Sequence, residues 1–252
     1  MILLLNAANR AAFPALMDDM FRARHEVLVE MKGWEELRRP DGRESDALDR
    51  PDALYLLAVE KGRVLGGVRF TGTERPTLAA GILPELFEDE PVLGPDVLEM
   101  SRLFSRAETG PGDDLSPLLG EMMAAGAELA LIIGARGWLT IADLGLAQGL
   151  LAWGAHLEPL GLPRRTRDGA MMAVMTHASG RSARMLRKAR RLTRPALFWA
   201  DDPVTPPRAW AEILGLDAAE PSWIPPGDAT PLQRAHMTPW RLAELSRGGR
   251  PP

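Results

Sequence analysis

Hydrophobic and polar positions along the first 180 residues follow patterns that predict both helices and strands. Apolar residues that recur every three to four positions are typical of amphipathic helices, whereas short apolar runs bounded by Gly and Pro are typical of strands. This alternation predicts a mixed α/β sandwich in which helices cover one antiparallel-to-mixed sheet. We expect helices over residues 14–30, 115–136 and 147–156, strands over 53–60, 64–71, 97–104, 138–143 and 171–177, and a short strand at the start of the sequence.

The last 72 residues differ in composition from the rest of the chain. Residues 1–180 carry 27 acidic and 18 basic side chains, whereas residues 181–252 carry 7 and 12, together with 11 of the 22 prolines. Such a Pro-rich stretch is typical of an irregular tail wrapped on a core, or partly mobile, rather than of a second domain. We therefore expect a core domain over 1–180, and a basic helix over 181–194 that begins a Pro-rich C-terminal extension.

Composition excludes several classes of chemistry. The 252 residues are 46% hydrophobic and 25% charged and contain no Cys, so an ordinary globular protein without disulfides, thiolate nucleophiles or Cys-bound metals is expected. The four His are scattered without ligand spacing, and no Gly-rich nucleotide motif or Gly-x-Ser-x-Gly occurs, so we expect no metal site and no prosthetic group. The first residues lack the features of an export signal, and the apolar run 122–133 is too short to span a membrane, so a cytoplasmic protein is expected.

Charged residues lie within strands that are otherwise apolar. Arg69 lies in 64–71, and Glu99 and Arg102 lie in 97–104. Unpaired charge is costly to bury, so these residues either form a cross-strand ion pair or face a polar ligand. Because Glu99 and Arg102 are three positions apart, a regular strand would point them to opposite faces, and both can serve one cleft only if a bulge or bend intervenes.

A second cluster follows the first predicted helix. Arg24, Trp34, Glu44, Asp46 and Asp49 combine one aromatic ring with several carboxylates, which suits a cationic ligand. The alternative is a solvated acidic loop anchored by its Trp.

Taken in order, these residues resemble the acyl-homoserine-lactone synthase family, the autoinducer synthases of bacterial quorum sensing. The similarity extends to about residue 180, but position 28 is Leu where the family usually has Phe, and position 48 is Leu where Tyr is common. The matching text is Arg24-x-x-Val27, Trp34, Glu44-x-Asp46-x-x-Asp49, Tyr55-Leu56, Gly62-Arg63-x-x-Gly66-Gly67-x-Arg69 and Glu99-x-Ser101-Arg102.

The resemblance implies a three-layer sandwich like that of the Gcn5-related N-acetyltransferases, with 1–180 as the catalytic domain. It implies acyl transfer from a thioester of acyl carrier protein or coenzyme A to the amine of S-adenosylmethionine, followed by lactone closure that releases methylthioadenosine. The alternatives are an acyltransferase of the same fold that acts on another amine, and a non-catalytic protein that binds acyl or adenosyl ligands.

The resemblance also implies roles for individual residues. Glu99 is the expected general base, with Arg69 and Arg102 beside it, and Asp46 and Asp49 are expected to meet the charged amine and sulfonium. S-adenosylmethionine would further contact Trp34, Arg24, Arg69 and Arg102, and the acyl pocket would include Met100, Ser101, Phe104, Thr140 and Leu144.

The basic segment 181–194 holds seven Lys or Arg and no acid. Since acyl carrier protein is acidic, we expect a docking surface formed by Arg164, Arg165, Arg187 and Arg191. The alternative is a solvated basic helix. Nucleic acid is not an expected partner, because the sequence pI is near 5.7 and the segment lacks interleaved aromatic residues.

Overall fold

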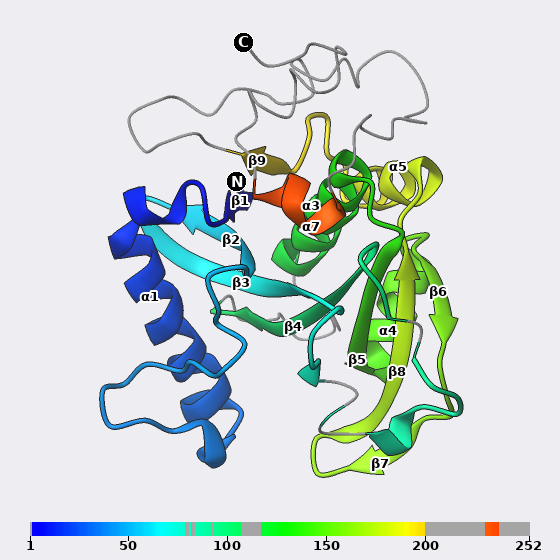
Figure 1. Cartoon of the computed structure of the whole chain (residues 1–252), viewed down its shortest axis with the longest axis horizontal. Helices are drawn as coiled ribbons and strands as arrows, with labels where there is room; N and C mark the ends of the chain where they lie inside the picture. The colour runs from blue at the N-terminus through cyan, green and yellow to red at the C-terminus, as the bar shows by residue number, and fades with distance from the viewer. Residues whose placement is uncertain are drawn as a thin grey trace.

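The computed structural model describes residues 2–78, 81, 84–91, 93–106, 117–199 and 230–236. Within these ranges the strands form one mixed sheet in the order β6-β8-β5-β4-β3-β2-β1-β9, and β7 pairs with β8 (Figure 1). The strands are β1 (Ile2–Leu5), β2 (Leu54–Glu60), β3 (Arg63–Gly72), β4 (Val97–Ser105), β5 (Gly137–Asp143), β6 (His156–Pro159), β7 (Arg164–Thr166), β8 (Gly169–His177) and β9 (Leu197–Trp199). The helices are α1 (Pro14–Arg24), α3 (Pro117–Ile133), α4 (Leu144–Ala152), α5 (Gly180–Ala189) and α7 (Pro231–Ala235), and the segments Arg10–Ala12, Glu35–Leu37 and Pro84–Leu86 are 3-10 turns.

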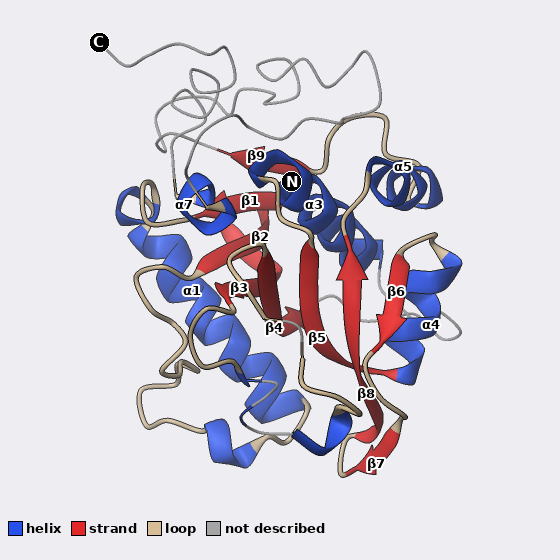
Figure 2. Ribbon diagram, turned by 45° about the vertical axis from the view of Figure 1, so that its right-hand side comes forward, coloured by secondary structure: helices blue, strands red, loops and turns tan. Residues whose placement is uncertain are grey.

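Helices lie on both faces of the sheet, so the expected three-layer α/β sandwich is confirmed (Figure 2). Alternation along β2 divides the core in two, because Leu54 and Leu56 join the cluster around α3 whereas Tyr55 and Leu57 join the cluster around α1. Both clusters consist of fully buried apolar side chains, and this burial is the main stabilising contribution to the fold.

The expected elements of the core are confirmed, with corrections at their ends. The helix expected over 14–30 is α1, and its last turns continue as a π-helix over His25–Met31. The helix expected over 147–156 is α4, which begins earlier because the Asp143 carboxylate caps the backbone N–H of Leu146 at 2.8 Å. It ends before Gly154, whose φ is +87°, so that His156 belongs to β6.

Short strands were missing from the sequence-based prediction. β6, β7 and β9 are only three or four residues long, and strands of this length carry little periodic signal. The basic helix expected over 181–194 is α5, which ends at Ala189.

The described segments beyond residue 180 pack on the same core as the rest. Strand β9 pairs in parallel with β1 at the edge of the sheet, and α5 and α7 both contact α3. Within the described ranges, no helix combines the length and hydropathy needed to cross a membrane.

A β-bulge in β4 shifts the alternation of its side chains between the two faces of the sheet by one residue. Gly67 and Arg69 are two positions apart on β3, whereas their partners on β4, Phe104 and Ser101, are three positions apart. Arg102 takes the extra position with a φ of +53°. The side chain of Phe104 therefore lies on the α1 face, although regular alternation from Met100 would point it toward α3.

The ladder between β4 and β5 ends while both strands continue. These parallel strands pair only from Val97↔Gly137 to Glu99↔Leu139, after which they separate (Figure 2). Beyond this point the Thr140 hydroxyl donates to the carbonyl of Met100 at 3.0 Å. The splayed strands therefore begin to part next to Glu99, where the sequence places the candidate base.

Candidate active site

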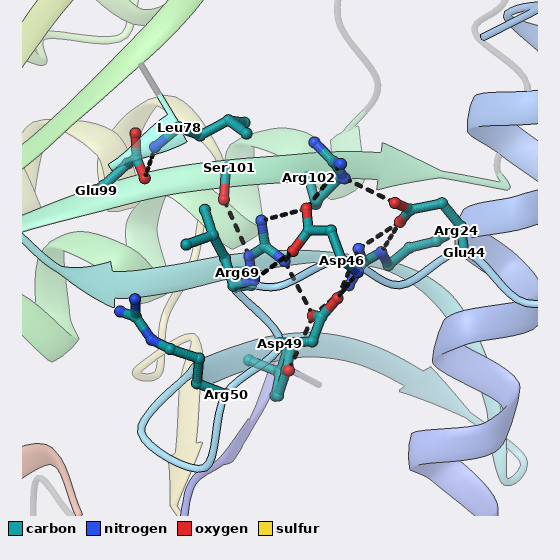
Figure 3. A network of polar contacts seen from close by, with 12 residues as sticks. Arg24, Glu44, Asp46, Asp49, Arg50, Arg69, Leu78, Glu99, Ser101 and Arg102 are labelled. Atoms are coloured by element: carbon teal, nitrogen blue, oxygen red, sulfur yellow. Dashed lines mark hydrogen bonds and ion pairs between the residues drawn. The ribbon is translucent and has the colours of Figure 1, made fainter. Parts of the chain in front are cut away.

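Six charged side chains from four parts of the chain form one buried network on the α1 face of the sheet (Figure 3). α1 supplies Arg24, the loop between α1 and β2 supplies three carboxylates, and β3 and β4 supply Arg69 and Arg102. The carboxylates belong to Glu44, Asp46 and Asp49.

Asp49 is at the centre of the network. Its carboxylate accepts two hydrogen bonds from Arg24, at 2.7 and 3.2 Å, and one from the hydroxyl of Tyr55 at 3.0 Å. Arg69 approaches the same carboxylate to 3.1 Å. Burial opposes the charge of Asp49, but the two guanidinium groups outweigh this effect and lower its pKa to about 2.

Asp46 lies at the more exposed side of the network. Arg69 binds its carboxylate with two hydrogen bonds, at 2.6 and 3.0 Å, and Arg102 approaches it to 2.7 Å. The pKa of Asp46 is lowered because these guanidinium groups outweigh the cost of its partial burial. The side chain of Asp46 is 21% exposed, against 4% for Asp49 and 1% for Glu44. Asp46 is therefore the carboxylate of the network best placed to meet a ligand.

Glu44 connects Arg24 to Arg102. Arg24 Nε donates to its carboxylate at 2.5 Å, and Arg102 Nε donates to the other oxygen at 3.0 Å. The backbone N–H of Glu44 donates to the carbonyl of Phe21, which fastens the loop to α1. Sequence reasoning placed Glu44 in the family motif and among carboxylates suited to a cationic ligand, and the structure shows that it bridges α1 to the bulge of β4.

The bulge explains why Arg102 belongs to this network. A regular β4 would have turned Arg102 toward α3, whereas the extra residue turns it toward Glu44 and Asp46. Of the bulge or bend that the sequence spacing called for, the structure has the bulge. With three arginines and three carboxylates, the network is neutral when all six groups are charged, and the burial of each charge is compensated by an opposite one.

Glu99 lies on the same face of β4 as Ser101, whose hydroxyl accepts from Arg69 Nε at 3.1 Å. The Glu99 side chain is 1% exposed, and its carboxylate accepts the backbone N–H of Leu78 at 2.9 Å. Figure 3 shows Glu99 and the arginine–carboxylate network at two separate positions along β4, with Ser101 between them. Ser101, expected in the acyl pocket, thus contacts the guanidinium of Arg69.

The structure places Trp34 at a contact between distant segments. Its indole N–H donates to the carboxylate of Asp168 at 2.9 Å, in the turn between β7 and β8, and Glu36 forms an ion pair with Arg167 of the same turn. The ring also packs against the apolar cluster on the α1 face. Its expected contact with S-adenosylmethionine stays a prediction.

The residues expected in the acyl pocket are divided between the two faces of the sheet. Met100 and Leu144 join the cluster around α3, and the hydroxyl of Thr140 contacts the backbone of Met100. Phe104 lies on the opposite face, in the cluster around α1. A single pocket on the α3 face therefore does not include the Phe104 ring, because the bulge turns this ring away.

The arginines expected at the docking surface do not form one patch. Arg164 and Arg165 are exposed on β7, whereas Arg187 lies on α5 and Arg191 just beyond it, at the other end of the molecule in both views (Figures 1 and 2). Arg187 also turns inward, with its Nε 3.7 Å from the buried carboxylate of Glu128. The four arginines therefore lie in two separate groups, and the docking of acyl carrier protein to either group stays a prediction.

Comparisons with known proteins identify the family of the chain. The family model described as autoinducer synthase matches residues 10–186. An isovaleryl-homoserine lactone synthase from Bradyrhizobium diazoefficiens is 33% identical over 224 residues, which cover 87% of this chain and 98% of the relative. An acyl-homoserine-lactone synthase from Pseudomonas aeruginosa is 24% identical over 176 residues, covering 69% and 85% of the two chains.

Solved structures show the same fold. BjaI, a CoA-dependent acyl-homoserine lactone synthase solved with SAM and isopentyl-CoA, is 31% identical with a TM-score of 0.70, covering 78% of this chain and 92% of BjaI. MesI, also a CoA-dependent acyl-homoserine lactone synthase, is 27% identical with a TM-score of 0.70 over 78% of this chain and 98% of MesI. The chain belongs to the autoinducer synthase family. It is an acyltransferase of the acyl-homoserine-lactone synthase class.

Proposed function

We propose that this enzyme transfers an acyl group from acyl-CoA to the amine of S-adenosylmethionine and then closes the lactone. The support for coenzyme A is that the two solved relatives with a TM-score of 0.70 are described as CoA-dependent and that one was solved with SAM and isopentyl-CoA. The isovaleryl-homoserine lactone synthase from Bradyrhizobium diazoefficiens matches this chain over 98% of its own length. Its product supports a short branched acyl chain as the first donor to test.

In the acyl-transfer step, the amine nitrogen forms a bond to the thioester carbonyl carbon, and the carbon–sulfur bond of the thioester breaks. The substrate ammonium must first lose a proton, and the Glu99 carboxylate is the proposed acceptor, directly or through one water. Glu99 lies beside the point where β4 and β5 part, so a thioester between these strands would place its carbonyl within reach of the amine. The amine nitrogen loses a second proton as the amide forms, and the thiolate of coenzyme A takes up this proton and leaves as the thiol.

In the lactonisation step, the substrate carboxylate attacks the carbon attached to the sulfonium, and the carbon–sulfur bond breaks. The positive sulfonium becomes the neutral thioether of methylthioadenosine, so the negative charge of the carboxylate and the positive charge of the sulfonium disappear together. The proposed role of Asp46 is to hold the cationic end of the substrate, and Asp49, with its pKa near 2, stays ionised and fixes Arg24 and Arg69.

The observation that carries this proposal is the neutral network around Asp46, beside a buried Glu99 at the splay of two strands, in a chain of this family. Neutrality is important because the arginines hold the carboxylates in fixed orientations. The partly exposed Asp46 carboxylate can then bind the cationic end of the substrate.

The test is a donor comparison with the purified full chain. S-adenosylmethionine is supplied with isovaleryl-, butyryl- and hexanoyl-CoA, and in parallel with the same acyl groups on acyl carrier protein, and the products are separated by mass spectrometry. We expect lactone and methylthioadenosine in equal amounts, with the highest kcat/KM for a CoA donor. A preference for the carrier protein would contradict the assigned donor, and acylation without methylthioadenosine would contradict the assigned amine.

A further inference from the structure

A short C-terminal segment, Thr230–His236, is bound against the core beside the active-site loop. Its helix α7 buries Ala235 completely, and the carbonyl of Ala235 accepts a hydrogen bond from the Asn6 side chain at 2.8 Å. Arg234 Nε donates to the carbonyl of Ile133 at the end of α3, at 2.6 Å. These contacts fix the position of the residue that follows the helix, His236.

The imidazole of His236 joins two segments that are far apart in the sequence. Its Nδ1 lies 3.2 Å from the backbone nitrogen of Ala7, and its Nε2 lies 3.1 Å from the carbonyl oxygen of Asp52. A backbone N–H can only donate, so Nδ1 must accept and Nε2 must carry the proton that it donates to Asp52. The bridge therefore requires the neutral imidazole.

The surroundings of His236 favour this neutral form. Burial lowers its pKa, and the nearby guanidinium of Arg10 acts in the same direction. The hydrogen bond to the Asp52 carbonyl and the charge of the Asp52 carboxylate act in the opposite direction, and the net pKa is lowered. Asp52 also forms ion pairs with Arg50 and Arg75, which reduces its pull on the imidazole.

The bridge acts on the loop that carries the active-site carboxylates. Asp52 is three residues beyond Asp49, and the carbonyl of Arg50, between them, accepts a hydrogen bond from Arg10 at 3.0 Å. Two backbone carbonyls therefore hold the C-terminal end of this loop in place. Arg10 binds the carbonyl of Arg50, and His236 binds the carbonyl of Asp52.

The same segment also contacts the strand that carries Arg69. Leu232 packs over Gly72 so closely that a Cβ at this position would lie 2.7 Å from Leu232 Cδ2. Gly72 directly follows Thr71, the residue paired with Glu99 across β3 and β4. The C-terminal segment therefore touches both supports of the site, the carboxylate loop and the end of β3.

We propose that His236 is a positioning residue, which fastens the Thr230–His236 segment to Asp52 and so holds Asp46 and Asp49 in place for S-adenosylmethionine. This proposal rests on the proposed function of those two carboxylates. It predicts that a change at His236 weakens the use of S-adenosylmethionine more than the use of the acyl donor.

The first test compares His236→Ala with His156→Ala, which alters an exposed histidine on the edge strand β6. For the folded His236→Ala enzyme we expect the KM for S-adenosylmethionine to rise roughly ten-fold, the size expected for the loss of two neutral hydrogen bonds. The KM for acyl-CoA and kcat should stay within about two-fold, and the control should match the wild type. An unchanged KM for S-adenosylmethionine in folded His236→Ala overturns the proposal.

The second test uses His236→Gln, which keeps a side-chain amide donor for Asp52 but cannot be protonated. The matched variant is His236→Phe, which fills a similar volume but can neither donate to Asp52 nor accept from Ala7. We expect the KM for S-adenosylmethionine to rise roughly ten-fold in His236→Phe and by less than about three-fold in His236→Gln. Equal KM values in the two folded variants overturn the proposal, and this comparison decides the matter even if His236→Ala fails to fold.

Asp46→Asn separates this proposal from the proposed function. If Asp46→Asn raises the KM for S-adenosylmethionine and His236→Ala does not, the positioning proposal alone fails. If neither variant changes this KM while the wild type turns over, the assignment of the carboxylates to S-adenosylmethionine is the part that fails.

Discussion

Replacing Asp49 by Asn tests whether the buried network depends on balanced charge. The substitution keeps the size of the side chain and removes one of the three negative charges that oppose Arg24, Arg69 and Arg102. The pKa of Asp49 is about 2, against an ordinary value of 3.8, and at about 1.4 kcal/mol per pKa unit this difference corresponds to roughly 2.5 kcal/mol of stabilisation. We expect Asp49→Asn to lower the free energy of unfolding by about 2–3 kcal/mol at pH 7.5.

The assay is urea unfolding followed by tryptophan fluorescence, with Asp41→Asn as the matched control, because Asp41 is exposed on the same loop. The control should lose less than about 0.5 kcal/mol.

The pH dependence has a definite sign. A carboxylate whose pKa is lowered in the folded state stabilises the protein at pH values above its pKa in the unfolded state. The difference in free energy of unfolding between wild type and Asp49→Asn should therefore disappear as the pH falls from about 4 to about 2. Equal stability of wild type and Asp49→Asn at pH 7.5, or equal losses in the two variants, would refute the reasoning.

Three further changes have distinct expected outcomes. Glu99→Gln should lower kcat by about two to four orders of magnitude in steady-state assays while the melting temperature stays near that of the wild type, and wild-type turnover would leave only a structural role. Burial raises the pKa of Glu128 to about 7, although its carboxylate accepts two backbone hydrogen bonds, from Leu197 of β9 and from Ala196 before it. The stability that a raised carboxyl pKa contributes is lost as the pH rises, so the stability of the wild type relative to Glu128→Gln should fall by up to about 3 kcal/mol from about pH 4.5 to about pH 7. A flat difference in urea unfolding would contradict that pKa. Charge reversal at Arg165 and Arg191 should leave the KM for acyl-CoA unchanged, and a change confined to acyl carrier protein would show where that donor binds.

Much of the fold could be predicted from the sequence because its core elements have strong local signals. The strands from β2 to β5 and helix α3 are long enough for their periodicity to be seen. The order of strands in the sheet and the small strands β6, β7 and β9 depend on long-range pairing, which periodicity does not report.

The sequence identified which residues belong to the candidate site better than it predicted how they are arranged. The residue types and order of the family motif identified Arg24, Asp46, Asp49 and Arg69, which the structure brings together. The need for a bulge or bend between Glu99 and Arg102 followed from the two-residue period of a strand. This bulge also turned Phe104 to the other face, a consequence that the sequence spacing did not specify in advance.

The contacts that sequence reasoning missed are those between segments without a shared motif. The bridge from His236 to Asp52, the contact of Trp34 with Asp168, and the burial of Glu128 against β9 each join residues more than 60 positions apart. Only the three-dimensional fold brings such pairs together, and one sequence has no pattern that reports them.

The most direct measurement follows the nitrogen atom of the substrate. The purified protein is incubated with isovaleryl-CoA and S-adenosylmethionine labelled with ¹⁵N at its amino group, and the products are identified by mass spectrometry. We expect the lactone amide to carry ¹⁵N and one methylthioadenosine to appear for each coenzyme A released. Release of coenzyme A without a ¹⁵N-labelled lactone, from a protein that unfolds cooperatively, would contradict this expectation.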